Sequence, residues 1–169
     1  MENKNLEIIL MPLEERFRDQ FIKDNQEAFR YGATEEFGLR DEHFEDDGEI
    51  ISRQTIEECL DDEHSHAFRV ICNGEYSGGI ILNVNALTHE GSLEIFFILP
   101  ALHSRGIGKA AWRRVEEMFP EITVWTTCTP CFEKRNIHFY VNCLGFKIVF
   151  PDFNYQEDER MLMFRKDIS

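Results

Sequence analysis

The chain has 169 residues and carries 18 lysines and arginines against 32 aspartates and glutamates, a formal net charge of −14. This length is typical of one globular domain with a single core, so we expect residues 1–169 to form one domain. Such acidity disfavours nucleic-acid binding, because phosphate backbones select for lysine and arginine, and it favours cationic or amine partners. Acidity that only keeps the protein soluble is the simpler explanation, and it stays open.

No segment has the length and apolar character of a membrane-spanning helix, and the N-terminus lacks the basic and apolar regions of a secretory signal. We therefore expect a cytoplasmic protein without a membrane partner. The five cysteines are scattered and odd in number, which is typical of reduced thiols in that compartment.

The first half of the chain predicts a strand, two helices and a meander. The strand covers Leu6–Met11, a helix begins at Pro12, and a second short helix is predicted over Ser52–Leu60. Between the helices, from Tyr31 to Gly48, periodicity fades and acidic residues accumulate, which indicates a loop or loose helix beside a site. Three strand-like runs then follow, separated by the short turn-rich gaps typical of antiparallel neighbours: Ala67–Cys72, Gly78–Asn85 and Ser92–Leu99.

The second half of the chain alternates between helices and strands. Helices are predicted over Gly106–Phe119 and Glu133–Cys143, and strands over Ile122–Thr127, Phe146–Phe150 and Met161–Arg165. An antiparallel half followed by a strand-helix-strand crossover predicts a mixed α/β sheet.

The run His103-Ser104-Arg105-Gly106-Ile107-Gly108-Lys109-Ala110-Ala111 comes directly after an apolar strand and opens a helix. Unpaired N–H groups and the helix dipole at such a start attract phosphate. Gly106 and Gly108 let the backbone approach an anion, while Arg105 and Lys109 add positive charge. The run therefore predicts a phosphorylated ligand, although a glycine pair before a helix also occurs as plain turn chemistry.

Two other phosphate motifs do not fit this run. A P-loop needs four residues between its glycines and a hydroxyl after the lysine, whereas one residue separates Gly106 from Gly108 and Ala110 follows Lys109. The dinucleotide fingerprint expects an early βαβ unit and an acidic residue at the end of the next strand. Here a meander precedes the loop and the next strand ends in Thr126-Thr127-Cys128, so a nicotinamide cofactor is not expected.

Together with a second motif, the loop resembles a known family. A strand, then Q/R-x-x-G-x-G/A at a helix start, then a strand-helix unit closing in an aromatic-rich run and Gly-Phe is similar to the pattern of the GNAT (Gcn5-related) N-acetyltransferases. His103-Ser104-Arg105-Gly106-Ile107-Gly108 carries the first motif and Phe139-Tyr140-Val141-Asn142-Cys143-Leu144-Gly145-Phe146 carries the second. The resemblance covers Ala67 to Arg165, with His103 standing where the family most often has Gln or Arg.

This resemblance implies the GNAT-like acyl-CoA N-acyltransferase fold, with acetyl-CoA held where two central parallel strands, Ser92–Leu99 and Ile122–Thr127, splay apart. It implies that backbone groups of the loop hold the pyrophosphate and that the backbone near Ile98 bonds the pantetheine. Asn136 either reaches the pantetheine or caps its helix. The implied cofactor-binding residues are Ile98, His103, Arg105, Gly106, Ile107, Gly108, Lys109, Ala110 and Asn136.

The implied activity is direct acetyl transfer to a primary amine in a ternary complex, which needs a base for the amine and an acid for the leaving thiolate. Glu94 is the candidate base, because strand alternation places it on the face of Phe96 and Ile98, or else it is a solvated carboxylate. Tyr140 is the candidate acid by resemblance. It lies five residues before Gly145, whereas the commoner family spacing is four, so either a helix irregularity restores its position or it is a core aromatic residue.

Other interpretations compete with the transferase. The fold also suits a CoA-binding sensor without efficient catalysis. Cys128-Thr129-Pro130-Cys131, between a strand and a helix, permits a thiol redox protein, although a thioredoxin-like fold places this motif earlier. No cysteine and histidine spacing predicts a metal site. The sequence does not identify the acceptor beyond a small-molecule or peptide amine. If the protein forms an oligomer, a homodimer is the commonest form.

Overall fold

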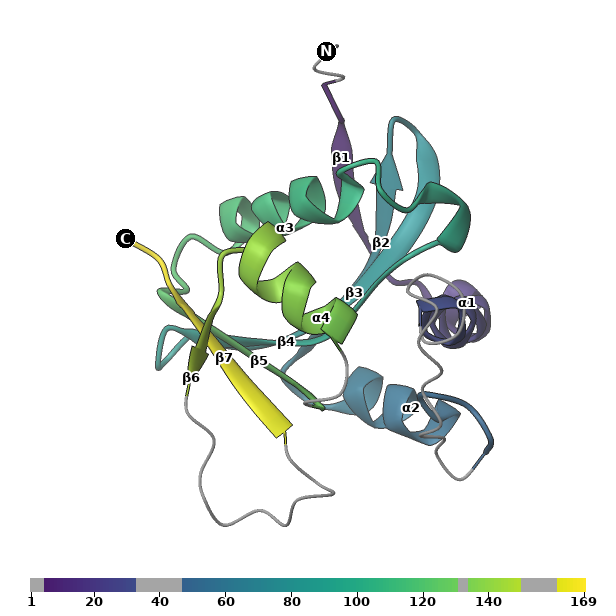
Figure 1. The fold of residues 1–169 in the computed structure, drawn as a ribbon, viewed down its shortest axis with the longest axis horizontal. Helices are drawn as coiled ribbons and strands as arrows, with labels where there is room; N and C mark the ends of the chain where they lie inside the picture. The colour runs from purple at the N-terminus through teal and green to yellow at the C-terminus, as the bar shows by residue number, and fades with distance from the viewer. Residues whose placement is uncertain (1–4, 33–46, 131–133, 150–160) are drawn as a thin grey trace.

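The computed structural model describes residues 5–32, 47–130, 134–149 and 161–169. These residues form one seven-stranded sheet with the order β1-β2-β3-β4-β5-β7-β6 (Figure 1). Only β4 and β5 pair in parallel, and the other neighbouring strands are antiparallel. The predicted mixed α/β sheet is therefore confirmed. The strands are β1 Ile8–Pro12, β2 Ser65–Cys72, β3 Glu75–Asn85, β4 Glu90–Ile98, β5 Val124–Pro130, β6 Lys147–Val149 and β7 Met161–Asp167.

The helices form a layer on each face of the sheet. Alternate residues of a strand point to opposite faces, so Ile80 and Leu82 pack beneath α3, while Ile81 packs beneath α1 and α2. Figure 1 shows α3 and α4 close together, with α1 and α2 at another side of the sheet. The helical elements are the turn η1 Glu15–Phe17, α1 Arg18–Tyr31, α2 Arg53–Asp61, the turn η3 Pro100–Leu102, α3 Ile107–Met118, α4 Lys134–His138 and the π-turn η4 Phe139–Cys143.

The two helices of the first half form for local reasons. Ser52 caps α2, because its side-chain oxygen accepts from the Thr55 backbone N–H at 3.1 Å. The helix predicted to begin at Pro12 starts later, since a 3₁₀ turn, closed by Phe17 N–H to the Glu14 carbonyl, precedes α1. Residues 33–46, which hold most of the weakly periodic stretch, lie outside the described residues.

The parallel pairing of β4 with β5 is short. It runs from Glu90 opposite Val124 to Ser92 opposite Thr126, although both strands continue beyond these pairs. Trp125 holds this contact together: its side chain is fully buried, and its ring meets Trp112 of α3 edge-on with centroids 5.2 Å apart. The resemblance predicted that these two central strands splay apart, and the pairing confirms it.

A β-bulge lies in β4 just after the paired residues. Ile95 is opposite Ile81 and Leu93 is opposite Leu82, so Glu94 is an extra residue without a partner in β3. Side-chain alternation shifts by one at this point, and Leu93 and Phe96, three residues apart, both pack in the layer beneath α3. The expectation that Glu94 shares a face with Phe96 and Ile98 is therefore wrong, because it assumed an uninterrupted strand.

Replacement of Gly91 by alanine tests the packing that joins β4 to β5. A Cβ at Gly91 would lie 2.4 Å from the Trp125 ring. We expect Gly91→Ala to lower the free energy of unfolding by about 1–3 kcal/mol, because the methyl group overpacks the contact. This loss should exceed the small stabilisation that alanine gives by reducing the conformational entropy of the unfolded chain. Urea unfolding measures the change.

The matched control is Trp125→Phe, alone and combined with Gly91→Ala. The smaller ring leaves room for the methyl group, so the double variant should be more stable than the sum of the single losses predicts. Full additivity would show that the two residues do not meet.

Candidate active site

Beyond Ser92 and Thr126, β4 and β5 separate, and the described residues include no further ladder pairs between them. The Thr127 hydroxyl, which is buried, donates to the Leu93 carbonyl at 2.8 Å and closes the paired region. From there to Ile98, no strand among the described residues pairs with the edge of β4 that faces β5. An extended ligand with amide groups can occupy such an edge by hydrogen bonding as a strand does.

The N-terminus of α3 lies after this edge and is rich in unbonded N–H groups. The first intrahelical bond runs from the Ala110 N–H to the Gly106 carbonyl at 3.1 Å, so the N–H groups of Ile107, Gly108 and Lys109 precede any helical acceptor. Gly106 has φ 78°, in the left-handed region that suits glycine. Such N–H groups and the helix dipole favour anions, and phosphate binding by this loop stays a prediction.

Gly108 has a packing role that the sequence did not indicate. A Cβ at this position would lie 2.8 Å from the Phe139 ring, which also meets Phe96 edge-on with centroids 5.4 Å apart. The glycine therefore lets η4 approach α3 closely. Gly106, in contrast, has open space around it and is required for its backbone conformation.

His103 turns back onto the end of β4. Its Nε2 donates to the Ile98 carbonyl at 2.7 Å, and Arg135 of α4 donates to the other side of the ring at 3.3 Å. Tyr31 meets the ring edge-on, with centroids 5.6 Å apart. The side chain of His103 thus engages the carbonyl of the residue whose backbone was predicted to bind pantetheine.

Arg135 is a site residue that sequence reasoning missed. Its guanidinium contacts His103 and also packs against the end of α1, where a Cβ at Gly32 would lie 2.2 Å from Nη1. Arg135 thus places a positive charge at the C-terminus of α1, where the dipole of that helix favours it. No motif marks this residue, because the contact joins segments about a hundred residues apart.

Glu94 is exposed and lies on the face of α2. The Ser92 hydroxyl donates to Glu94 Oε1 at 2.5 Å. Burial and then the charge of Glu94 raise the pKa of the Cys59 thiol in α2 to about 11. Glu94 comes two residues after Ser92, which is the last residue of β4 paired with β5, and its charge contributes to the raised pKa of Cys128 in β5. The carboxylate therefore lies where β4 and β5 begin to diverge.

Tyr140 lies in the irregular helix η4. The Leu144 N–H bonds to the Phe139 carbonyl five residues back, at 3.0 Å, so this turn holds one residue more than an α-helix would. The π-turn is a helix irregularity of the kind that the sequence analysis considered for the five-residue spacing from Tyr140 to Gly145. Tyr140 is also nearly buried and packs edge-on against Phe164, with centroids 5.4 Å apart.

Asn136 joins α4 to β5. Its side-chain amide donates to the Thr129 hydroxyl at 3.2 Å, and Thr129 is buried. The bond fixes the distance between the helix and the strand on one side of the splay. This contact differs from the capping role considered for Asn136, because the amide reaches a neighbouring strand.

The redox interpretation loses its physical support at Cys128. This residue lies within β5 and not in the first turn of a helix, and partial desolvation of its thiol and the charge of Glu94 raise its pKa. A reactive thiol needs a lowered pKa. Cys131 lies outside the described residues. Within the described segments, no three His, Cys, Asp or Glu side chains gather as a metal site.

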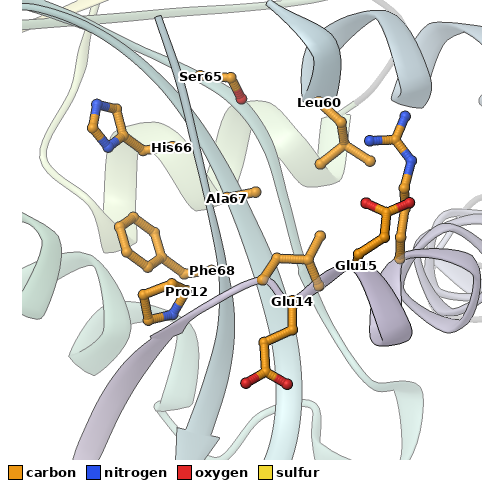
Figure 2. Close-up of a pocket in the computed structure, with 10 residues that line it drawn as sticks. Pro12, Glu14, Glu15, Leu60, Ser65, His66, Ala67 and Phe68 are labelled. Carbon is orange, nitrogen blue, oxygen red and sulfur yellow. The ribbon is translucent and has the colours of Figure 1, made fainter.

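A surface cavity of about 340 Å³ lies elsewhere on the molecule (Figure 2). Figure 2 shows Glu14 and Glu15 on one side of it and His66 and Phe68 on another. The cavity is formed by the end of β1, the starts of η1 and α1, the end of α2 and the start of β2, and none of the predicted site residues line it. The residues that the sequence analysis predicts for the site therefore lie away from this cavity.

Comparisons with known proteins agree with this geometry. The sequence profile of the acetyltransferase (GNAT) family matches residues 16–146. The Bacillus subtilis (strain 168) protein YrkN, itself uncharacterized, is 37% identical over 150 residues, which are 88% of this chain and 78% of that protein. Among the helices of the described residues, none is both long and apolar enough to cross a membrane.

Solved structures are similar in fold. The ribosomal-protein-S18-alanine N-acetyltransferase of Escherichia coli superposes with a TM-score of 0.66 at 17% identity, over 96% of this chain and 95% of that one. A Bacillus subtilis acetyltransferase in complex with CoA gives a TM-score of 0.66 at 16% identity, over 98% and 100%. Spermidine N-acetyltransferase from Vibrio cholerae, in complex with CoA and spermine, gives 0.63 at 13% identity, over 95% of each chain.

Alkylation of Cys128 tests whether Glu94 lies beside it. The raised pKa makes the thiolate rarer, so at pH 8 iodoacetamide should label Cys128 more slowly than a cysteine in an unfolded peptide. Glu94→Gln removes a negative charge and should lower this pKa, so that labelling at the same pH becomes faster. Peptide mapping by mass spectrometry follows each cysteine separately.

Cys72 is the internal control, because burial and Glu75 raise its pKa and Glu94 is not among the causes. Its labelling should not change in Glu94→Gln. Equal rates for Cys128 in the two proteins would show that the carboxylate and the thiol are not neighbours.

Proposed function

The chain belongs to the acetyltransferase (GNAT) family, and we propose that it transfers an acetyl group from acetyl-CoA to a primary amine. The main support is the separation of β4 from β5 directly beside the N-terminus of α3. An open strand edge and a cluster of free N–H groups then adjoin each other. The strand edge can form hydrogen bonds with an amide-containing arm, and the N–H groups can bind a pyrophosphate.

In this proposal the backbone N–H groups from Arg105 to Lys109 hold the pyrophosphate, and Ala110 begins the hydrogen-bonded part of the helix. Arg105 and Lys109 are exposed and add positive charge. The arm of the cofactor lies along β4 toward Ile98, with Asn136 on the other side of the opening. His103 already bonds the Ile98 carbonyl, so the arm uses the β4 backbone before that residue or replaces the imidazole.

The chemistry is a direct transfer. The amine nitrogen, once neutral, attacks the thioester carbonyl, a C–N bond forms, and the C–S bond breaks. The proton of the amine passes to Glu94, directly or through water, and the leaving thiolate receives a proton from Tyr140. Support for Glu94 comes from its place at the start of the divergence, and support for Tyr140 comes from the π-turn.

Binding of acetyl-CoA is the first test. Titration calorimetry of the parent protein should show saturable binding, and Gly108→Glu should weaken it roughly tenfold or more, because it adds a carboxylate at the anion site. Met118→Glu is the matched control, since it adds the same single negative charge on an exposed position at the other end of α3. It should bind normally.

Circular dichroism checks that Gly108→Glu is folded, because its side chain also approaches Phe139. Should the parent protein bind no acetyl-CoA, the proposed function is wrong whatever the variants do.

Turnover is the second test. With an amine that the parent protein acetylates, release of the CoA thiol should fall about 10²- to 10⁴-fold in Glu94→Gln and fall also in Tyr140→Phe, because each loses a proton-transfer group. Glu90→Gln, at the exposed start of the same strand, is the control and should keep full activity. Unchanged rates in both site variants would exclude the acid and base roles and favour a CoA-binding sensor.

A further inference from the structure

The sheet face that carries Glu94 is covered on one half only. On this side α1 packs on β3 and β4, and α2 packs on β2 and β4. Beyond β4, each of β5, β7 and β6 has an exposed apolar side chain on the same face: Cys128 is exposed, and Met163 and Val149 are each 43% exposed. In the described residues, the helical cover on this side thus ends at β4.

These three residues stand in one row. Cys128 is opposite Met163 in the pairing of β5 with β7, and Met163 is opposite Val149 in the pairing of β7 with β6. The charge of Glu94 is one cause of the raised pKa of Cys128, so the carboxylate lies near the Cys128 end of the row. Neighbouring strands lie about 4.8 Å apart, which makes the part from Cys128 to Val149 about 10 Å long.

The row is apolar from Cys128 onward. Although the side chain of Cys128 is exposed, partial loss of water around its thiol and the charge of Glu94 raise its pKa, which keeps the thiol neutral near neutral pH. Charge returns in the adjacent row, where Thr126, Arg165 and Lys147 are opposite one another. Arg165 is paired with Asp167 at 2.9 Å, and Lys147 is exposed. Among the described residues, a ligand in the apolar row therefore meets the carboxylate of Glu94 at one end and the flanking cation Lys147 toward the other, while Asp167 is paired with Arg165.

We propose that the acceptor is a primary amine on an apolar body, with its amino group at Glu94 and its body along the row Cys128, Met163 and Val149. This inference rests on the proposed function. A single ammonium group is attracted by Glu94, and an apolar body removes the exposed side chains from water. A polyamine fits worse, because its second ammonium group would lie over apolar side chains and near Lys147.

A series of alkylamines tests the inference. With propylamine, butylamine, pentylamine and hexylamine, kcat/KM should rise about two- to fourfold for each added methylene group, because each one covers more of the row. Hexamethylenediamine has the length of hexylamine and a second charge, and it should be the poorer acceptor. Release of the CoA thiol measures all of these reactions.

Met163→Glu changes the middle of the row. It should flatten the dependence on chain length and raise hexamethylenediamine relative to hexylamine, because the second ammonium group gains a carboxylate partner. Met118→Glu is the matched control: Met118 is 38% exposed, similar to Met163, but lies on α3 away from the row. The control should keep the parent's dependence on chain length.

The outcomes separate the two proposals. Failure to bind acetyl-CoA would remove the proposed function itself. If the protein binds acetyl-CoA and acetylates an amine, but kcat/KM does not depend on alkyl length or the diamine is preferred, the apolar acceptor is excluded while the transferase stands. A change in Met118→Glu equal to that in Met163→Glu would also overturn the inference.

Discussion

The contact of Trp125 with Gly91 fixes where the site begins. The Trp125 side chain is fully buried, and its ring lies so close to Gly91 that no other residue fits there without movement. This contact holds β4 and β5 together over a few residues, and the Thr127 bond to the Leu93 carbonyl closes the paired segment. Everything proposed for the site lies just beyond, where the strands are no longer held. The opening is therefore positioned by a rigid buried contact and not by a loop.

The two sides of this opening are joined by separate interactions. Phe139 packs on Gly108 and Phe96, so η4, α3 and β4 meet at one point. Arg135 connects α4 to His103 and to the end of α1. A shift of α4 would consequently be felt in the anion-binding start of α3 and in the helix that leads toward residues 33–46. Movements of α4, of the start of α3 and of the end of α1 are thus mechanically linked.

Most of the fold could be predicted from the sequence because its strands and helices carry clear periodicity. The loop from His103 to Lys109 could also be placed, since glycine pairs and helix starts are local signals. The face of Glu94 could not, because a bulge changes the alternation of a strand without any marker in residue type. Arg135 was missed because its contacts depend on tertiary packing. The π-turn could be predicted only in part, because its one signal in the sequence is the unusual spacing from Tyr140 to Gly145.

The bulge at Glu94 gives β4 one residue that has no partner in β3. Leu93 and Ile95 are opposite consecutive residues of β3, so deletion of Glu94 would join them without moving any later side chain to the other layer. Phe96 would keep its contact with Phe139, and Phe97 would keep Phe21, which it now meets edge-on with centroids 5.2 Å apart. Insertion of a residue in the regular part of the strand would instead move every later side chain to the opposite layer. Neither core therefore requires Glu94, and the strand carries this carboxylate in addition to the residues that its packing needs.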